Sequence, residues 1–166
     1  MKDFNEIISK FAIVGTVAEV KPLGNGLIND TYIVKTADDA TPDYVLQPIN
    51  HHIFTDVDTL QHNIEAVTTH IRRKLEETGA DDIDRKVLTF VKTTDGTKTY
   101  YFDGDSYWRV MVFIPRAHTF EAVNPESSRN AGKAFGNFQA MLVDLDEDLK
   151  ESIPDFHNME FRIKQL

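Results

Sequence analysis

The sequence of 166 residues contains no cysteine. This absence excludes disulfides, thiolate zinc sites, iron–sulfur clusters and cysteine nucleophiles. Long apolar runs are lacking too: the longest outside a turn, Val110 to Ile114, is far shorter than the roughly 20 residues that a membrane helix needs. The N-terminal residues show no apolar core of a secretory signal. We therefore expect an unprocessed cytoplasmic chain with no membrane partner.

Positive charge is scarce. The sequence has 18 lysines and arginines against 27 aspartates and glutamates, so its net charge is -9. Such a field opposes a large polyanion, and nucleic acid is not an expected partner. Apolar residues make up 41% of the chain and charged residues 27%, which is typical of a globular protein with a buried core.

The first part of the chain predicts a short helix followed by strands. Apolar residues at helical spacing indicate a helix over 4–13. Alternation then indicates strands from Val14 and from Ile28, joined as a hairpin by a glycine-rich turn. A third strand begins at Tyr44, and Pro48 marks its end or a sheet edge, because proline cannot donate to a ladder.

A long amphipathic helix is predicted next, with apolar residues at steps of three and four from Val57 to Leu75. Thr55 with Asp58 resembles a capping box, and Gly79 marks the end. Three further strands, over 87–91, 99–102 and 107–114, form a meander. This element order predicts the α+β class: a mainly antiparallel sheet of about five strands with one long packed helix.

The chain changes character at Pro115, where a turn-prone connector begins. Asn124 and Pro125 then start a helix, and a further helix precedes the C-terminus. We accordingly predict two parts, 1–118 and 119–166.

Three features could carry chemistry, and each also has a plain structural interpretation. The turn Gly24-Asn25-Gly26 could present backbone N–H groups to phosphate, or be an ordinary hairpin turn. Glu65 could reach inward from the long helix, but Gln47 stands where a lysine would complete an ion pair. The run ending at Ile114 could contact an adenine edge, or be a core strand. No metal site is expected, since H-E-x-x-H and a third ligand are missing.

Consecutive motifs along the whole chain resemble one family. They include Gly24-Asn25-Gly26-Leu27-Ile28-Asn29-Asp30-Thr31-Tyr32, Tyr44-Val45-Leu46-Gln47-Pro48-Ile49-Asn50, Asn63-Ile64-Glu65-Ala66-Val67, Trp108-Arg109-Val110 and Phe135-Gly136-Asn137-Phe138. With these motifs the sequence is similar to the N-acetylhexosamine 1-kinase-like branch of the aminoglycoside phosphotransferase and choline kinase superfamily.

This resemblance implies a kinase-like, nucleotide-binding N-lobe over 1–118, followed by the first helices of an incomplete C-lobe. It also implies ATP with Mg²⁺ as cofactor. The residues implied in nucleotide binding are Gly24, Asn25, Gly26, Leu27, Ile28, Asn29 and Thr31 around the turn, Gln47, Glu65, and Val112, Phe113 and Ile114 as the hinge. Gln47 departs from the lysine or arginine of most phosphotransferases in the superfamily, so less phosphate charge is neutralised there.

The family's catalytic Asp, on an H-x-D loop, its Mg²⁺ ligands and most sugar contacts lie in the C-lobe, and no H-x-D sequence occurs before Leu166. We therefore expect the ATP-binding lobe of a phosphotransferase, inactive alone, whose full-length form phosphorylates the anomeric hydroxyl of an N-acetylhexosamine. Two alternatives stay open: a non-catalytic nucleotide-binding or interaction module, and a kinase of an amino alcohol or aminoglycoside.

Self-association is the first testable prediction. Helices cut off from a larger C-lobe would leave Phe135, Phe138, Phe156 and Ile163 without cover, so we expect the chain to associate through this surface. Size-exclusion chromatography over a concentration series should show a shift to larger species. A clean monomer at the highest concentration would contradict the prediction.

Overall fold

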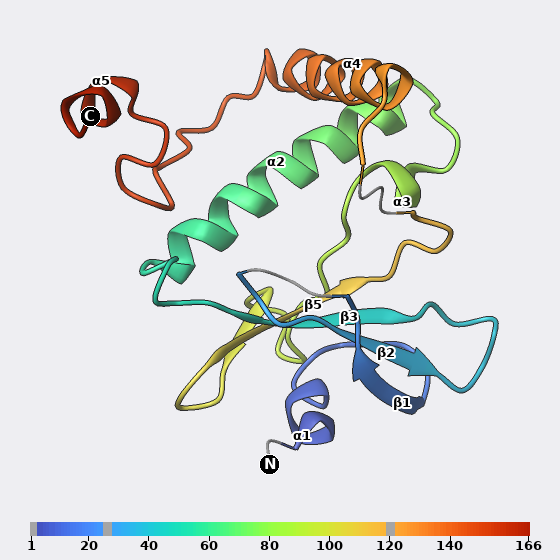
Figure 1. Ribbon diagram of the computed structural model, residues 1–166. Helices are drawn as coiled ribbons and strands as arrows, with labels where there is room; N and C mark the ends of the chain where they lie inside the picture. The colour runs from blue at the N-terminus through green and yellow to red at the C-terminus, as the bar shows by residue number, and fades with distance from the viewer. Residues whose placement is uncertain (1–2, 25–27, 119–121) are drawn as a thin grey trace. The chain divides into compact units, whose positions relative to one another are not determined.

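The computed structural model describes residues 3–24, 28–118 and 122–166 (Figure 1). Contacts divide the chain into two compact units. The first comprises Met1–Ile64, Phe90–Phe113 and Leu149–Leu166, and the second comprises Glu65–Thr89 and Ile114–Asp148. The division into 1–118 and 119–166, which concerns lobes of a larger protein, stays a prediction.

The first unit is built on one antiparallel sheet of five strands, as the sequence predicts. The strands are β1 (Val17–Pro22), β2 (Tyr32–Thr36), β3 (Tyr44–Ile49), β4 (Tyr100–Phe102) and β5 (Tyr107–Val112), in the spatial order β1-β2-β3-β5-β4. The first two strands begin later than expected, at Val17 rather than Val14 and at Tyr32 rather than Ile28. The α+β class is thus confirmed.

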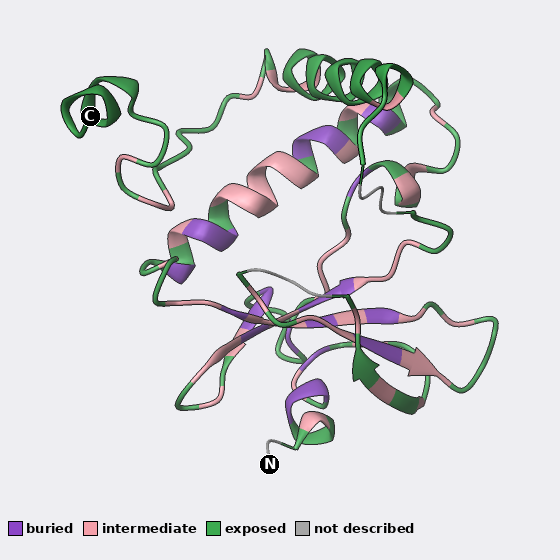
Figure 2. Ribbon diagram, in the orientation of Figure 1, coloured by how far each residue is buried: buried purple, intermediate pink, exposed green. Residues whose placement is uncertain are grey.

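One face of the sheet packs against α1 (Phe4–Ile8). Leu46 and Val110, from neighbouring strands, belong to a core that also holds Ile8 and Phe11, and all four are buried. Figure 2 shows buried positions in purple along α1 and the central strands. The expected helix over 4–13 is shorter because a turn at Ser9 and Lys10 follows Ile8 and the chain then joins the neighbouring segment at Phe11. Phe11 there forms a bridge with Thr93, and Ala12 N donates to the Lys92 carbonyl at 2.9 Å.

The opposite face packs against the first turns of α2 (Val57–Glu77). Ile49 and Tyr100 of the sheet contact Val57 and Leu60 of the helix in a second apolar cluster. The alternation of side chains along a strand explains this division, because Leu46 and Ile49 stand an odd number of positions apart and therefore face opposite ways.

The ends of α2 are close to those predicted, but its cap is a different residue. Asp56 Oδ1 accepts from Thr59 N at 2.9 Å, so Asp56, and not Thr55, satisfies the first turn. After the helix Gly79 adopts a φ of 64°, and Ala80 N reaches back to the Leu75 carbonyl at 2.9 Å. This left-handed residue ends the helix as predicted.

Pro48 was predicted to mark either the end of the third strand or a sheet edge. It lies inside β3, so the prediction of a strand end is wrong. It pairs with Trp108 of β5, whereas the pairing of β3 with β2 stops at Leu46 and Tyr32. The missing N–H of Pro48 therefore removes no bond to β2. Proline is tolerated at such a local edge even in a central strand.

The expected strand over 87–91 is wrong. A short helix, α3 (Ile83–Lys86), precedes this segment, and Val87 is buried against Ile71 and Leu75 of the second unit. In the first unit Phe90 forms only an isolated bridge with Met111. Val87 thus packs in the core of the second unit, whereas Val91 packs against the core of the first. A strand that binds one sheet edge along its whole length cannot do both.

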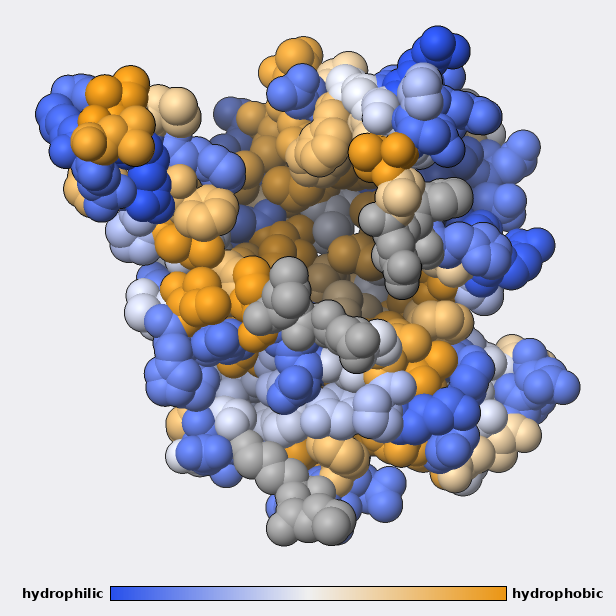
Figure 3. All heavy atoms as spheres, viewed as in Figure 1, coloured by the Kyte–Doolittle hydropathy of each residue, from blue (hydrophilic) through white to orange (hydrophobic). Residues whose placement is uncertain are grey.

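Two helices follow the connector, as predicted. Asn124 caps α4 (Pro125–Leu142) through a capping box with Ser127, and Asn158 caps α5 (Met159–Lys164). Both helices carry apolar side chains on their surfaces, which Figure 3 shows in orange. Among them are Phe135, which is 72% exposed, and Ile163, which is 65% exposed. Phe135 and Ile163 belong to the surface through which we expect the chain to associate, and self-association stays a prediction.

Among the residues that the structure describes, no helix combines the length and apolar character needed to cross a membrane.

The α1 face of the sheet generates a stability prediction. Val34 is 1% exposed in the core, whereas Val14 is 62% exposed. Replacing Val34 by Ala removes two buried methyl groups and should lower the free energy of unfolding by about 2 kcal/mol. Val14→Ala, the matched control, should change it by less than about 0.5 kcal/mol. Urea denaturation measures both, and equal effects would contradict this assignment of the core.

Candidate functional site

The predicted glycine-rich turn joins β1 to β2. Gly24 adopts a φ of 69°, a left-handed conformation that favours glycine, and a Cβ there would meet no atom within 4 Å. The next residues of the turn, Asn25, Gly26 and Leu27, lie outside the described residues. Ile28, where the description resumes, is 49% exposed.

The returning side of this turn is tied to the segment after β3. Asn29 Oδ1 accepts from Asn50 N at 2.8 Å, and Asn50 Nδ2 donates to the Ile28 carbonyl at 3.1 Å. These residues, together with His51 and Ser106, line a pocket of about 250 Å³. Two side chains predicted to bind nucleotide, Ile28 and Asn29, therefore border a hollow whose position is fixed by β3.

Gln47 has both ends of its amide occupied by protein groups. Its Oε1 accepts from Arg109 Nε at 3.0 Å and from Arg109 Nη2 at 2.7 Å. Its Nε2 donates to Thr31 Oγ1 at 3.0 Å. The structure therefore brings together two predicted residues, Gln47 and Thr31, around an arginine that the sequence analysis did not select as a functional residue.

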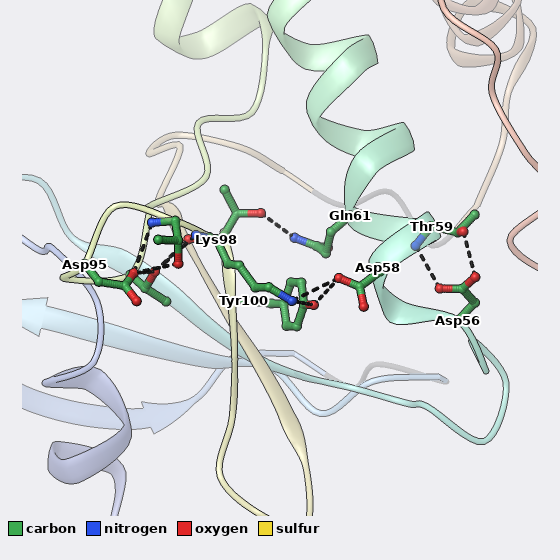
Figure 4. A network of polar contacts seen from close by, with 10 residues as sticks. Asp56, Asp58, Thr59, Gln61, Asp95, Lys98 and Tyr100 are labelled. Atoms are coloured by element: carbon green, nitrogen blue, oxygen red, sulfur yellow. Dashed lines mark hydrogen bonds and ion pairs between the residues drawn. The ribbon is translucent and has the colours of Figure 1, made fainter.

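Gln61 extends this network from α2. Its Oε1 accepts from Arg109 Nη1 at 3.1 Å, and its Nε2 donates to Thr99 Oγ1 at 3.0 Å. The side chain is only 2% exposed. Figure 4 shows Gln61 directed from the helix towards the segment that precedes β4. A buried amide in this position holds the guanidinium from the side opposite Gln47.

Arg109 is a partly buried cation with neutral partners. Burial lowers the pKa of its guanidinium from 12.5 to about 10, so the group stays protonated at neutral pH. The ring of Phe90 lies 5.8 Å from the guanidinium carbon, within the range of a cation–π contact. Among the described residues, no carboxylate forms an ion pair with Arg109.

A signal for Arg109 was present in the sequence. Side chains alternate between the two faces of a strand, so Arg109 shares a face with Tyr107 and Met111. It is the one charged residue in a strand that is otherwise apolar or aromatic. Gln61 gave a weaker signal, because it borders the apolar stripe of the helix in the same way as Glu65. Only the packing of α2 on the sheet distinguishes the two.

The remaining residues predicted to bind nucleotide are Glu65 and the hinge. Glu65 is half-buried on the next turn of α2 and belongs to the second unit. Val112 pairs with Tyr44 at the end of β5, Phe113 N donates to the Asp43 carbonyl at 2.8 Å, and Ile114 begins a segment of the second unit. The roles predicted for these residues in nucleotide binding stay predictions.

A second polar group lies near the start of α2. Asp58 Oδ1 accepts from Lys98 Nζ at 3.0 Å and from the Tyr100 hydroxyl (Figure 4). Hydrogen bonds from Tyr100 and then Lys98 lower the pKa of the Asp58 carboxyl. The group is thus an internally paired contact between helix and sheet. No cluster of three potential metal ligands occurs within residues 3–24, 28–118 and 122–166.

Comparison with models of known protein families finds no match for this chain.

The turn before β4 generates a pH prediction. Hydrogen bonds from the Thr93 hydroxyl and from the Thr97 amide and hydroxyl lower the pKa of Asp95 from 3.8 to about 2 (Figure 4). Because the folded-state pKa is the lower one, the stabilisation is complete above about 4 and is lost as the pH falls towards 2. Carbon-13 NMR titration of the carboxyl should show this midpoint.

Thr93→Val removes the largest cause of the shift and should move the Asp95 midpoint up towards 3.8. Thr94→Val, in the same turn, is the matched control and should leave it in place. An Asp95 midpoint near 3.8 in the unaltered protein would contradict these hydrogen bonds.

Proposed function

We propose that this chain is the nucleotide-binding lobe of a small-molecule phosphotransferase. In the intact protein the enzyme would phosphorylate the anomeric hydroxyl of an N-acetylhexosamine with ATP and Mg²⁺. The order of the sheet, with α2 in the connection from β3 to β4, is the observation that supports this most strongly. Protein kinases cover the nucleotide phosphates with a glycine-rich loop and carry a phosphate-binding lysine on β3.

Three elements of this chain support the proposal. A turn containing Gly24 joins β1 to β2, Gln47 lies on β3 beside that hairpin, and β5 pairs with β3 before it leads into the connector. Antiparallel pairing brings these three strands together in space, although Gln47 and the end of β5 are far apart in the sequence. The resemblance of the sequence motifs adds support from the same residues.

The residues around Gln47 suit the phosphate groups of a nucleotide. Arg109 retains its positive charge beside neutral amides, and planar guanidinium groups bind phosphate oxygens well. Bound Mg²⁺ would neutralise charge that develops on the transferred phosphoryl group. The aspartate that orients the acceptor hydroxyl belongs to an H-x-D motif, which this sequence does not contain. We therefore assign nucleotide binding to this chain, and transfer and sugar recognition to residues outside it.

Isothermal titration calorimetry with ATP and ADP, with and without Mg²⁺, tests this function. We expect saturable binding of both nucleotides and none of free N-acetylglucosamine. Gly24→Val should weaken nucleotide binding by tenfold or more, because a β-branched residue is strained at a φ of 69° and would reshape the turn.

Gly96→Val is the matched control, since Gly96 has a φ of 74° and also leaves open space for a Cβ. It should cost similar stability and leave the nucleotide Kd within twofold. Absence of binding to either nucleotide at millimolar concentration would reject the proposal. Phosphorylation of a panel of N-acetylhexosamines, amino alcohols and aminoglycosides by the intact protein then identifies the acceptor class.

A further inference from the structure

Arg109 differs from the other charged groups of the site in having no opposite charge beside it. Asp43, on the segment that leads into β3, is by contrast paired with Lys35 of β2, and the exposed Asp58 of α2 is paired with Lys98. The partners of Arg109 are the carbonyl oxygens of Gln47 and Gln61. A guanidinium removed from water without a counter-ion is costly, and native structures keep such groups rarely.

The guanidinium is held in one orientation. Gln47 Oε1 takes hydrogens from Nε and Nη2, and Gln61 Oε1 takes one from Nη1. These bonds use three of the five N–H donors of an arginine. One hydrogen on Nη1 and one on Nη2 remain, and no other described residue accepts them. The residue is partly buried and not fully enclosed. These two hydrogens are the donors that it has left for a small ligand.

Gln47 and Arg109 stand directly opposite each other in the register of β3 and β5. Side chains at such positions start only about 5 Å apart, and like charges there are destabilising. A lysine at position 47 would therefore repel Arg109, and a carboxylate would neutralise it. A neutral amide avoids both effects, since it satisfies the guanidinium hydrogens and leaves the positive charge in place.

We propose that Arg109 of β5 is the residue that binds the nucleotide phosphates in this lobe, with Gln47 as the residue that positions it. The charge usually carried by β3 is then supplied by the neighbouring strand. This inference rests on the proposed function, and it assigns the phosphate contact to Nη1 and Nη2 of Arg109. Two further residues hold this pair in place. Gln61 accepts a hydrogen bond from Nη1 of Arg109, and Thr31 accepts one from the amide of Gln47.

The test compares binding of ATP, ADP and inorganic pyrophosphate to four proteins by calorimetry. Gln47→Glu is the sharpest variant, since its carboxylate can accept the same hydrogens from Arg109, and the Thr31 hydroxyl can turn to donate. The variant should therefore stay folded with an equal or higher Tm. It should nevertheless lose at least tenfold in affinity for all three ligands, because the new carboxylate neutralises Arg109. A purely structural role for Gln47 would leave these affinities unchanged.

Two further variants complete the set. Arg109→Lys keeps a charge but loses the planar fork, and a loss of at least fivefold in affinity is expected. Arg73→Met is the control, since it removes one positive charge from an exposed ion pair with Glu77 on α2. It should leave all three affinities within twofold.

The outcomes separate this inference from the proposed function. Nucleotide binding that is unchanged in Gln47→Glu and Arg109→Lys overturns the role of Arg109 and leaves the proposed function standing. In a second outcome, the unaltered protein binds ATP no better than pyrophosphate, and Gln47→Glu loses pyrophosphate binding. This outcome upholds Arg109 as a phosphate site and contradicts nucleotide recognition. Absence of any binding overturns both.

A measurement on the unaltered protein covers the case in which a variant fails to fold. The Nε–H of Arg109 is hydrogen-bonded and shielded, so its proton–nitrogen NMR signal is observable and can be assigned by its loss in Arg109→Lys or by through-bond experiments. Saturating ATP should shift this signal. An unchanged Arg109 signal, while backbone signals of the Gly24 turn shift, would overturn the inference.

Discussion

The pairing of β3 with β5 is the constraint on which the rest of the structure depends. Six consecutive residue pairs, from Tyr44 with Val112 to Ile49 with Tyr107, form the centre of the sheet. Because side chains alternate across a strand, one register decides the composition of both faces. It places Leu46 beside Val110 on the α1 face and Gln47 beside Arg109 on the α2 face. A shift by one residue would exchange these faces and place a polar side chain of this pair in the apolar core.

The face of the sheet that packs against α2 carries both an apolar cluster and the polar network of Arg109. Ile49, Leu60 and Tyr100 pack together on this face, and the guanidinium of Arg109 lies among amides and hydroxyls of the same elements. Buried polar groups of this kind are tolerable only when each has a partner. No buried side-chain nitrogen or oxygen atom lacks one in the described part of the chain. Hydrogen bonds to Gln47 and Gln61 thus partly compensate for a charge that has no counter-ion among the described residues.

Local patterns predicted most of the elements but not all of their limits. The stripe from Val57 to Leu75 and the turn at Gly79 identified α2, since both signals depend on neighbours in the sequence. The segment over 87–91 was misassigned because Val87 is buried in the second unit and Val91 packs against the core of the first, which no local pattern records. Pro48 was likewise tolerated for a non-local reason, since β2 stops short of it.

From the sequence alone follow the class of fold, the long helix α2, the antiparallel pairing of β1 with β2, and the places of Gly24 in a turn and Gln47 on a strand. These follow from periodicity and turn chemistry, which act over a few residues. Only the tertiary structure decided what Gln47 does. Its partner, Arg109, lies 62 positions along the chain and Gln61 reaches the same guanidinium from another element. Strand register and helix packing set these contacts, and both depend on the burial of apolar surface across the whole sheet.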